Sequence, residues 1–161
     1  MGDSTNDSVV ESAVEFRLFV ESFDRQLWRS LVPAFGVDVA NEATADALAY
    51  AWQHWGRLRE MENPKGYLYR VARSYALPKR RPEPVLPEVD PARLPEYEPG
   101  LLPALAELTE MQRTVVYLVE GCQWGLTEVS ELLGVSVSTV RNHLARGMDR
   151  LRARLEVRVD V

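Results

Sequence analysis

The residues with the clearest chemical role lie in the segment 127–145, which has the layout of a helix-turn-helix. Small Ser130 allows two helices to approach, Gly134 supplies a left-handed turn residue, and Val140 and Leu144 anchor the second helix. Polar residues gather at the start and on the exposed side of that helix: Ser136, Ser138, Thr139, Arg141, Asn142, Arg146 and Arg150. Such a face can read the major groove of duplex DNA, and a helical hairpin with a solvated charged face is the alternative.

Residues along this face are expected to have different tasks. Arginine can fork onto a guanine edge and asparagine onto an adenine edge, and the first turns of a recognition helix enter the groove deepest. We therefore expect Arg141 and Asn142 to contact bases. Arg146, Arg150 and Arg152 follow later in the helix and are expected to contact phosphates.

A second group interleaves aromatic and cationic residues between positions 67 and 75. An unpaired base can stack on an aromatic ring while its phosphate meets a cation. Tyr75 is expected in the core and Tyr69 could lie in either environment. Tyr67, Arg70 and Arg73 are therefore the candidates for single-stranded nucleic acid.

The sequence offers no pattern for catalysis or for a metal site. His54 and His143 have no cysteine or carboxylate at ligand spacing, and Cys122 has no nearby histidine to activate it. Phosphate-binding glycine loops and paired catalytic carboxylates are also absent from the sequence. We expect no enzyme, no cofactor and no metal, and we interpret the four tryptophans as core or interface residues.

The elements that position these candidates are divided by a proline-rich stretch. Eight of the ten prolines lie between residues 78 and 103, where they disfavour helix. The 161-residue chain has a net charge of −5, but residues 61–82 carry six basic groups and one acidic group. Residues 83–112 carry one basic and seven acidic groups. We predict two small domains, 9–77 and 103–157, joined by an acidic linker over 78–102.

Apolar residues recur at helical spacing before the linker, and the pattern predicts three helices. The first is ended by Pro33 and Gly36, and the second runs from about residue 39 to 58. The third begins with Asn63 as N-cap and Pro64 in the first position, and its predicted buried stripe is Leu68, Val71, Ala72 and Tyr75.

The region after the linker shows helix signals and no strand-like alternation. Thr109 and Gln112 form a capping box, Thr127 and Ser136 are expected to cap two later helices, and Gly134 ends the first of them. The predicted fold class is all-α, with two small helical domains.

The C-terminal pattern resembles a known family. The segment 108–121, the helix-turn-helix after it and the segment 146–152 look like region 4 of bacterial extracytoplasmic-function sigma factors. The segments 16–31, 40–52 and 64–74 resemble region 2 of the same family. The resemblance implies a sigma factor that binds core RNA polymerase and directs promoter-specific transcription initiation.

The resemblance also implies roles for particular residues. The first domain would bind polymerase and the downstream promoter element, and the second would bind the upstream element through the helix-turn-helix face. Downstream-element residues are Tyr67, Arg70, Arg73 and Ser74. Polymerase-binding residues are Asp46, Tyr50 and Gln53. The implied partners are core RNA polymerase, promoter DNA and an anti-sigma factor or other protein regulator.

Two other functions remain open at this stage. The segment 138–144 also resembles the recognition helix of LuxR-type regulators, which bind DNA without polymerase and commonly as dimers. A degenerate sigma-like interaction module is the third possibility. In the sigma family the polymerase-contacting helix usually carries a Gln-Glu pair, and Ala45 and Asp46 stand at those positions here. The polar, acidic N-terminus and the absence of a long apolar run predict a cytoplasmic protein without membrane insertion.

Overall fold

The computed structural model describes residues 3–80 and 100–156, and these residues are helical with no strand among them. The all-α prediction is therefore confirmed. The elements in chain order are α1 (Asp3–Phe35), α2 (Val37–Gln53), α3 (Trp55–Leu58), α4 (Pro64–Ala76), the 3-10 turn η1 (Leu77–Lys79), α5 (Leu101–Ala106), α6 (Glu110–Val116), the π-helical turn η3 (Tyr117–Gly121), α7 (Leu126–Leu133) and α8 (Val137–Glu156).

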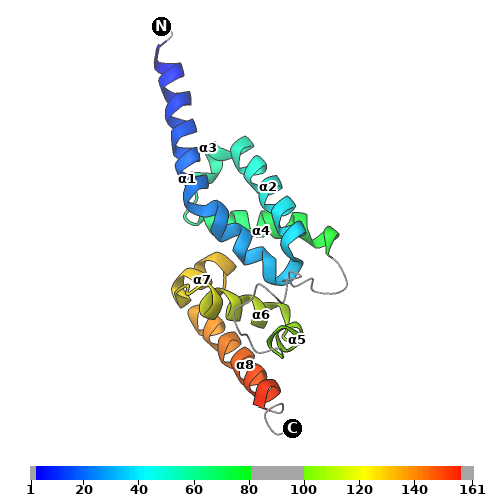
Figure 1. Ribbon diagram of the computed structural model, residues 1–161. Coiled ribbons are helices and arrows are strands. Elements are labelled where there is room, and N and C mark those ends of the chain that lie inside the picture. The colour runs from blue at the N-terminus through cyan, green and yellow to red at the C-terminus, as the bar shows by residue number, and fades with distance from the viewer. Residues whose placement is uncertain (1–2, 81–99, 157–161) are drawn as a thin grey trace.

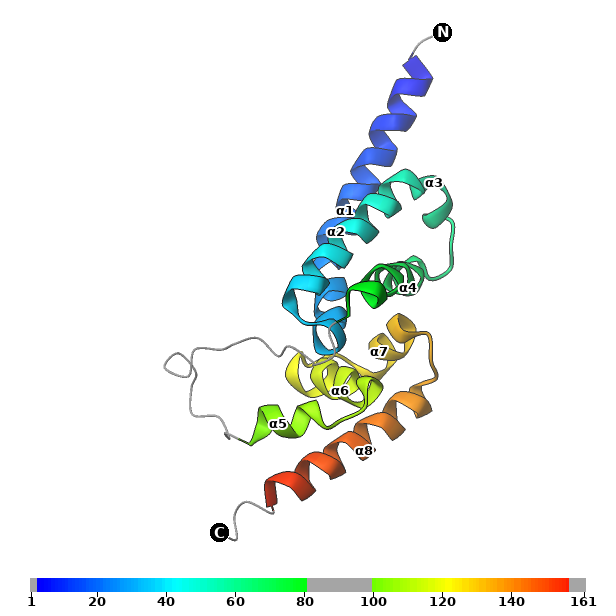
Figure 2. The same cartoon turned by 90° about the vertical axis from the view of Figure 1, so that its right-hand side faces the viewer.

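The helices form two groups that lie against each other (Figures 1 and 2). Helices α1 to α4 pack together at one end, and α5 to α8 pack together at the other. Contacts between the groups run from α1 to α6 and from α4 to α7. The first half of α1 projects beyond the rest of the molecule in both views.

The helix boundaries follow from local sequence signals. The Asn63 side chain accepts a hydrogen bond from the Gly66 amide, so it caps α4 as predicted. The Thr109 hydroxyl and the Gln112 side chain form the predicted capping box of α6. Gly134 ends α7 with φ 68° and ψ 33°, the left-handed conformation that glycine adopts without steric cost.

One apolar core extends through both groups of helices. Phe23, Leu27 and Leu68 from the first group belong to the same buried cluster as Leu118 and Val129 from the second. A smaller cluster joins α5, α6 and α8. The chain therefore has a seam between its two halves that is packed with apolar side chains, and the division into domains 9–77 and 103–157 stays a prediction.

Two predictions in the first half are wrong in detail. The second helix is not continuous to residue 58, because His54 leaves the helical region at φ −117° and ψ 18° and separates α2 from α3. Tyr75 is 37% exposed, whereas Tyr69 is 8% exposed and lies in the core. The core-facing stripe of α4 is therefore rotated toward Tyr69.

Two predictions about the second half also need correction. Gly125, not Thr127, precedes the first residue of α7, so Thr127 lies inside the helix. Helix α5 begins at Leu101, inside the predicted linker, and it contains Pro103 in its first turn. Proline is tolerated there because first-turn amides have no intrahelical acceptor. Residues 81–99 of the predicted linker lie outside the described residues.

Candidate nucleic-acid interface

The start of α8 is fixed by its own hydroxyl groups. The Ser136 Oγ accepts a hydrogen bond from the Thr139 amide at 3.1 Å, as an N-cap does. The same oxygen lies 2.9 Å from the Ser138 hydroxyl and 2.8 Å from the Thr139 hydroxyl. Val140 is fully buried and holds the opposite side of the helix in the core. The helix-turn-helix therefore presents a defined outer face.

Four predicted DNA-reading residues lie on this outer face. Ser138, Arg141, Asn142 and Arg146 are exposed along α8. In the described part of the chain no carboxylate pairs with Arg141 or Arg146. Their guanidinium groups are thus available to an external anion or base edge.

Arg150 has an internal contact that its sequence position did not predict. Its Nη1 donates a hydrogen bond to Gln112 Oε1 at 3.0 Å, and Gln112 is part of the α6 capping box. One turn later, Arg154 Nε donates to Glu107 Oε2 at 2.6 Å. The second half of α8 therefore fastens the helix to α5 and α6, while its first half remains free to bind.

A cluster of hydroxyls and guanidinium groups joins α2 to α4. The Tyr50 and Tyr67 hydroxyls are 2.9 Å apart, and Arg57 Nη2 donates to both, at 2.8 Å and 3.1 Å. The guanidinium groups of Arg57 and Arg70 lie 5.8 Å and 5.9 Å from the centre of the Tyr67 ring. The hydrogen bond with Tyr50 and partial burial raise the Tyr67 pKa, so this hydroxyl stays protonated at neutral pH.

Sequence reasoning missed Arg57 as a member of this cluster. Tyr50 lies in α2 and Arg57 in α3, and the break at His54 that brings them together has no signal in the residue spacing. Tyr69, by contrast, is not a member, since burial raises its pKa to about 12 and its ring lies in the core. The cluster combines an aromatic face with two cations, which suits an unstacked nucleotide.

Arg73 and Ser74 lie outside this cluster on α4, and Arg70 lies between the cluster and α7. Arg73 donates to Glu110 of α6, with Nη2 at 2.8 Å and Nε at 3.3 Å from Oε1. The Arg70 guanidinium lies beside the turn at Gly134. Ser74 is exposed and its hydroxyl donates to the Val71 carbonyl at 2.6 Å. The structure thus separates Tyr67, at the α2 side, from Arg73, at the α6 side.

Comparison with known proteins identifies the C-terminal helices. Residues 104–153 match the sequence model of sigma-70, region 4. This segment belongs to the sigma-70 region 4 family. No curated protein matches the chain. Since the matched segment contains the helix-turn-helix, the exposed face of α8 belongs to a region that binds DNA and RNA polymerase in sigma factors.

A solved structure shares the fold over both groups of helices. The chain is similar to the sigma factor RpoE, solved in a co-crystal structure with the anti-sigma factor NepR from Bartonella quintana, with a TM-score of 0.62 and 20% sequence identity. The similarity covers 89% of this chain and 98% of that one. At this level of identity the similarity shows a shared fold, which agrees with the all-α prediction.

The predicted polymerase-binding residues lie along α2, but only Gln53 is without an internal partner among the described residues. Lys79 Nζ lies 3.3 Å from Asp46 Oδ2 and 2.9 Å from Glu42 Oε2, and these contacts raise the Lys79 pKa. Tyr50 belongs to the cluster with Tyr67. The exposed face of α2 also carries Trp52, which is 52% exposed and was not predicted to bind polymerase.

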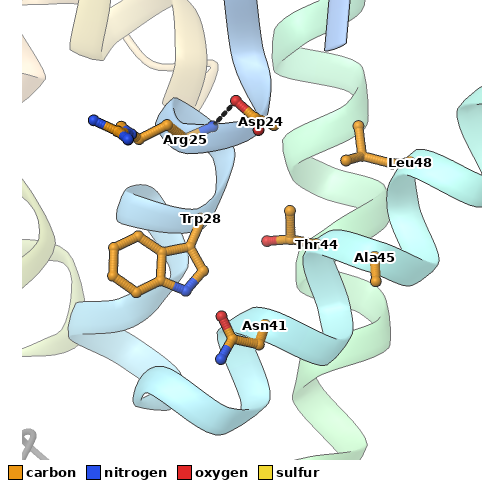
Figure 3. A pocket seen from close by; sticks show the side chains of 7 residues that line it. All are labelled: Asp24, Arg25, Trp28, Asn41, Thr44, Ala45 and Leu48. Atoms are coloured by element: carbon orange, nitrogen blue, oxygen red, sulfur yellow. Dashed lines mark hydrogen bonds between the residues drawn. The ribbon is translucent and has the colours of Figure 1, made fainter. Parts of the chain in front are cut away.

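A groove adjoins that face between α1 and α2 (Figure 3). It has a volume of about 360 Å³ and is lined by Asp24, Arg25, Trp28, Asn41, Thr44, Ala45 and Leu48. The Trp28 Nε1 and Thr44 Oγ1 atoms are buried beneath it without a hydrogen-bond partner in the described part of the chain. The exposed face of α2 is therefore continuous with a hollow that a partner side chain can enter.

The described residues include no cluster of three or more histidine, cysteine or acidic side chains that could hold a metal ion. None of the described helices is long and apolar enough to cross a membrane.

Proposed function

We propose that the chain is a sigma factor of the extracytoplasmic-function type, which directs promoter-specific transcription initiation and divides promoter recognition between its two groups of helices. Helix α8 binds the upstream element through Ser136, Ser138, Thr139, Arg141, Asn142 and Arg146. Arg150 contributes to the same site mainly by fastening α8 to Gln112, while it contacts phosphate through its other donors. The exposed and unpaired first half of α8 carries this proposal, because it lies in the segment that matches region 4.

The downstream element is assigned to α4 and to the cluster around Tyr67. The Tyr67 ring offers a stacking face for an unpaired base, and Arg57 and Arg70 place positive charge beside it. Ser74 and Arg73 extend this surface along α4. Tyr50, first expected to contact polymerase, supports the cluster by its hydrogen bond with Tyr67.

Core RNA polymerase is assigned to the exposed face of α2. Asp46 and Gln53 lie on this face, Trp52 adds an exposed aromatic anchor, and the groove beside Ala45 offers a hollow for a partner side chain. A protein regulator is also proposed, by analogy with the complex of RpoE and NepR. We further propose that the chain has no catalytic activity or cofactor and works in the cytoplasm, where polymerase and promoter DNA are found.

The test is reconstitution of the full chain with core polymerase and run-off transcription on genomic fragments. Specific transcripts are expected, and Arg141→Ala should reduce them. Arg17→Ala is the matched control, because it removes the same charge from a site on α1 where the side chain is 70% exposed. A stable homodimer that binds duplex DNA tightly without polymerase would contradict the proposal and favour a stand-alone regulator.

A further inference from the structure

The Glu110 carboxylate bridges the two halves of the molecule at the start of α6. Glu110 Oε1 accepts hydrogen bonds from Arg73 of α4, at 2.8 Å from Nη2, and Glu110 Oε2 accepts one from Arg80. The two oxygens of one carboxylate thus face two guanidinium groups from the first half of the chain. Glu110 is 25% exposed in its side chain, so the contact is partly shielded from water.

Positive charge exceeds negative charge at this point. Arg113, one helical turn after Glu110, is buried and adds a third guanidinium group close to the carboxylate. Burial alone would raise the Glu110 pKa, but the hydrogen bonds from Arg73 and Arg80 outweigh it and hold the pKa below its usual value. The arginines therefore surround a site that favours an anion with two available oxygens.

The same seam covers other parts of α4. Asn63 Nδ2 donates to the Glu131 carbonyl of α7 at 2.8 Å, and Gln26 Nε2 donates to Glu128 Oε1 at 2.8 Å. The Arg70 guanidinium lies against the turn at Gly134. In this arrangement α6 and α7 occupy the side of α4 that carries Arg70 and Arg73.

A DNA phosphate offers the same contacts as the Glu110 carboxylate. Both present a negative charge and two oxygens that a pair of guanidinium groups can bind, and charge-assisted hydrogen bonds of this kind do not depend on base sequence. Arg73 and Arg80 are 38% and 39% exposed in their side chains, but the donors that bind Glu110 are not available to a phosphate in the closed chain.

We propose that Glu110 is an internal phosphate mimic that closes the two halves of the chain and occupies Arg73 and Arg80. The closed chain must open along the seam before α4 meets the downstream promoter strand. This proposal rests on the proposed function for its DNA target. Core polymerase is the partner that shifts the equilibrium, because binding the two halves apart favours the open form.

The first experiment measures single-stranded DNA binding by the full chain without polymerase. The probe is a fluorescent thymidine oligonucleotide, followed by anisotropy at several salt concentrations. Removing the competing carboxylate with Glu110→Gln should tighten binding by about 3- to 10-fold, since it frees two cations for phosphate. The double variant Glu110→Gln with Arg73→Ala should lose most of that gain.

Glu107→Gln is the matched control for the change in charge. Glu107 is also a glutamate paired with an arginine, but its partner Arg154 belongs to the same half of the chain. Both variants remove one negative charge from the chain. Glu107→Gln should change oligonucleotide binding by less than about 2-fold, because the change in net charge alone has only a small effect. Equal effects of Glu110→Gln and Glu107→Gln would overturn the proposal.

The second experiment locks the seam reversibly. Cysteines replace Gln26 and Glu128, whose side chains are hydrogen-bonded across the seam, in a Cys122→Ser background. A short cross-linker that contains a reducible disulfide joins the two cysteines. With core polymerase, the locked chain should give no run-off transcript, and reductant should restore it. Each single-cysteine variant treated in the same way controls for modification alone.

The outcomes separate the two proposals. A locked chain that initiates as well as the released chain would overturn the closed-state inhibition. If the unlocked wild-type chain directs no transcript on any fragment, the proposed function fails, and the oligonucleotide experiment still decides whether Glu110 competes with phosphate. Tighter binding by Glu110→Gln that persists after Arg73→Ala would also contradict the mimic, because the gain would then come from elsewhere.

Discussion

The Asn63 side chain makes two hydrogen bonds in opposite directions, and one of them reaches Glu131 in the other half of the chain. Its Oδ1 accepts from the Gly66 amide at 2.8 Å and so caps α4, while its Nδ2 donates to the Glu131 carbonyl at 2.8 Å. Glu131 lies in the last turn of α7, whose final carbonyls have no partner within the helix. The Asn63 side-chain amide therefore caps the start of α4 and also gives a carbonyl in the last turn of α7 a hydrogen-bond donor.

Replacing Asn63 should separate these two roles. Asn63→Asp keeps the acceptor at the helix start and adds a charge favourable there, but it loses the donor to Glu131. We expect a loss of about 0.5–1.5 kcal/mol in the free energy of unfolding, from the seam alone. Asn63→Ala should cost about 1 kcal/mol more because the cap is also lost.

Chemical denaturation measures the stability of both variants, and amide hydrogen exchange shows where protection is lost. In Asn63→Asp, exchange should increase in α7 but not in α4. An Asn63→Asp variant with wild-type stability and unchanged exchange in α7 would show that the bond to Glu131 contributes nothing.

Gly66 lies where the seam is tightest. An added Cβ would come within 2.5 Å of Asn63 Nδ2 and 2.9 Å of the Glu131 carbonyl oxygen. Alanine is favoured over glycine by about 1 kcal/mol in a helix, but this contact should reverse the sign, so Gly66→Ala is expected to destabilise the chain. Gly56→Ala is the control, because nothing lies within 4 Å of its added Cβ, and it should be neutral or stabilising. Thermal unfolding of both variants tests the prediction.

Local signals were sufficient to predict much of the fold from the sequence. Asn63 with Pro64, the Thr109 and Gln112 capping box, and Gly134 each act within a few residues, and the structure shows all of them as expected. The face of α8 with Arg141 and Asn142 was also predictable, because helical periodicity separates it from buried Val140.

The seam could not be predicted in the same way. Arg73 was expected to bind DNA, and its partner Glu110 is 37 residues away with no periodic relation to it. Tyr75 was assigned to the core because helical periodicity placed it on one buried stripe with Leu68 and Ala72. The helix instead buries Tyr69, since α4 packs against α7 as well. Long-range packing of this kind leaves no spacing signal in the sequence.

Two arginines of α8 should differ in what they contribute to promoter binding. Arg141→Ala should cost about 1–3 kcal/mol on the cognate site and relax preference at one base position, because this residue enters the groove early in the helix. Arg146→Ala should weaken all sequences alike and reduce the slope of affinity against salt. Binding of the polymerase-bound chain to cognate and random duplexes measures both, and equal losses on both duplexes for both variants would contradict this division.

The ring of Tyr67 should contribute more than its hydroxyl. Tyr67→Ala removes the stacking face and should cost about 1–3 kcal/mol in binding of single-stranded downstream-element DNA. Tyr67→Phe keeps the ring and loses only the bonds to Tyr50 and Arg57, so affinity should stay within about 2-fold of wild type. Tyr75→Ala is a control on the same helix, since Tyr75 is exposed but outside the cluster. If Tyr67→Phe loses as much as Tyr67→Ala, the hydroxyl network and not stacking carries the binding.

The stabilising effect of Glu110 should disappear in acid. Its pKa is held below the usual value by Arg73 and Arg80, so folding favours the ionised form and the contribution to stability is complete above the ordinary glutamate pKa of about 4.3. It is lost as the pH falls through the lower, folded-state pKa, because protonation removes the charge that both arginines bind.

At neutral pH, Glu110→Gln should lower the free energy of unfolding by roughly 1 kcal/mol, a modest value because Arg73 and Arg80 are each more than one third exposed. The difference between wild type and Glu110→Gln should stay constant from about pH 7 to pH 5.5 and shrink below about pH 4.5. Denaturant unfolding of both proteins across this range measures it, and carboxylates common to both cancel. A difference that is unchanged at pH 3.5, or that grows in acid, would show that Glu110 stabilises the seam by packing and not by its charge.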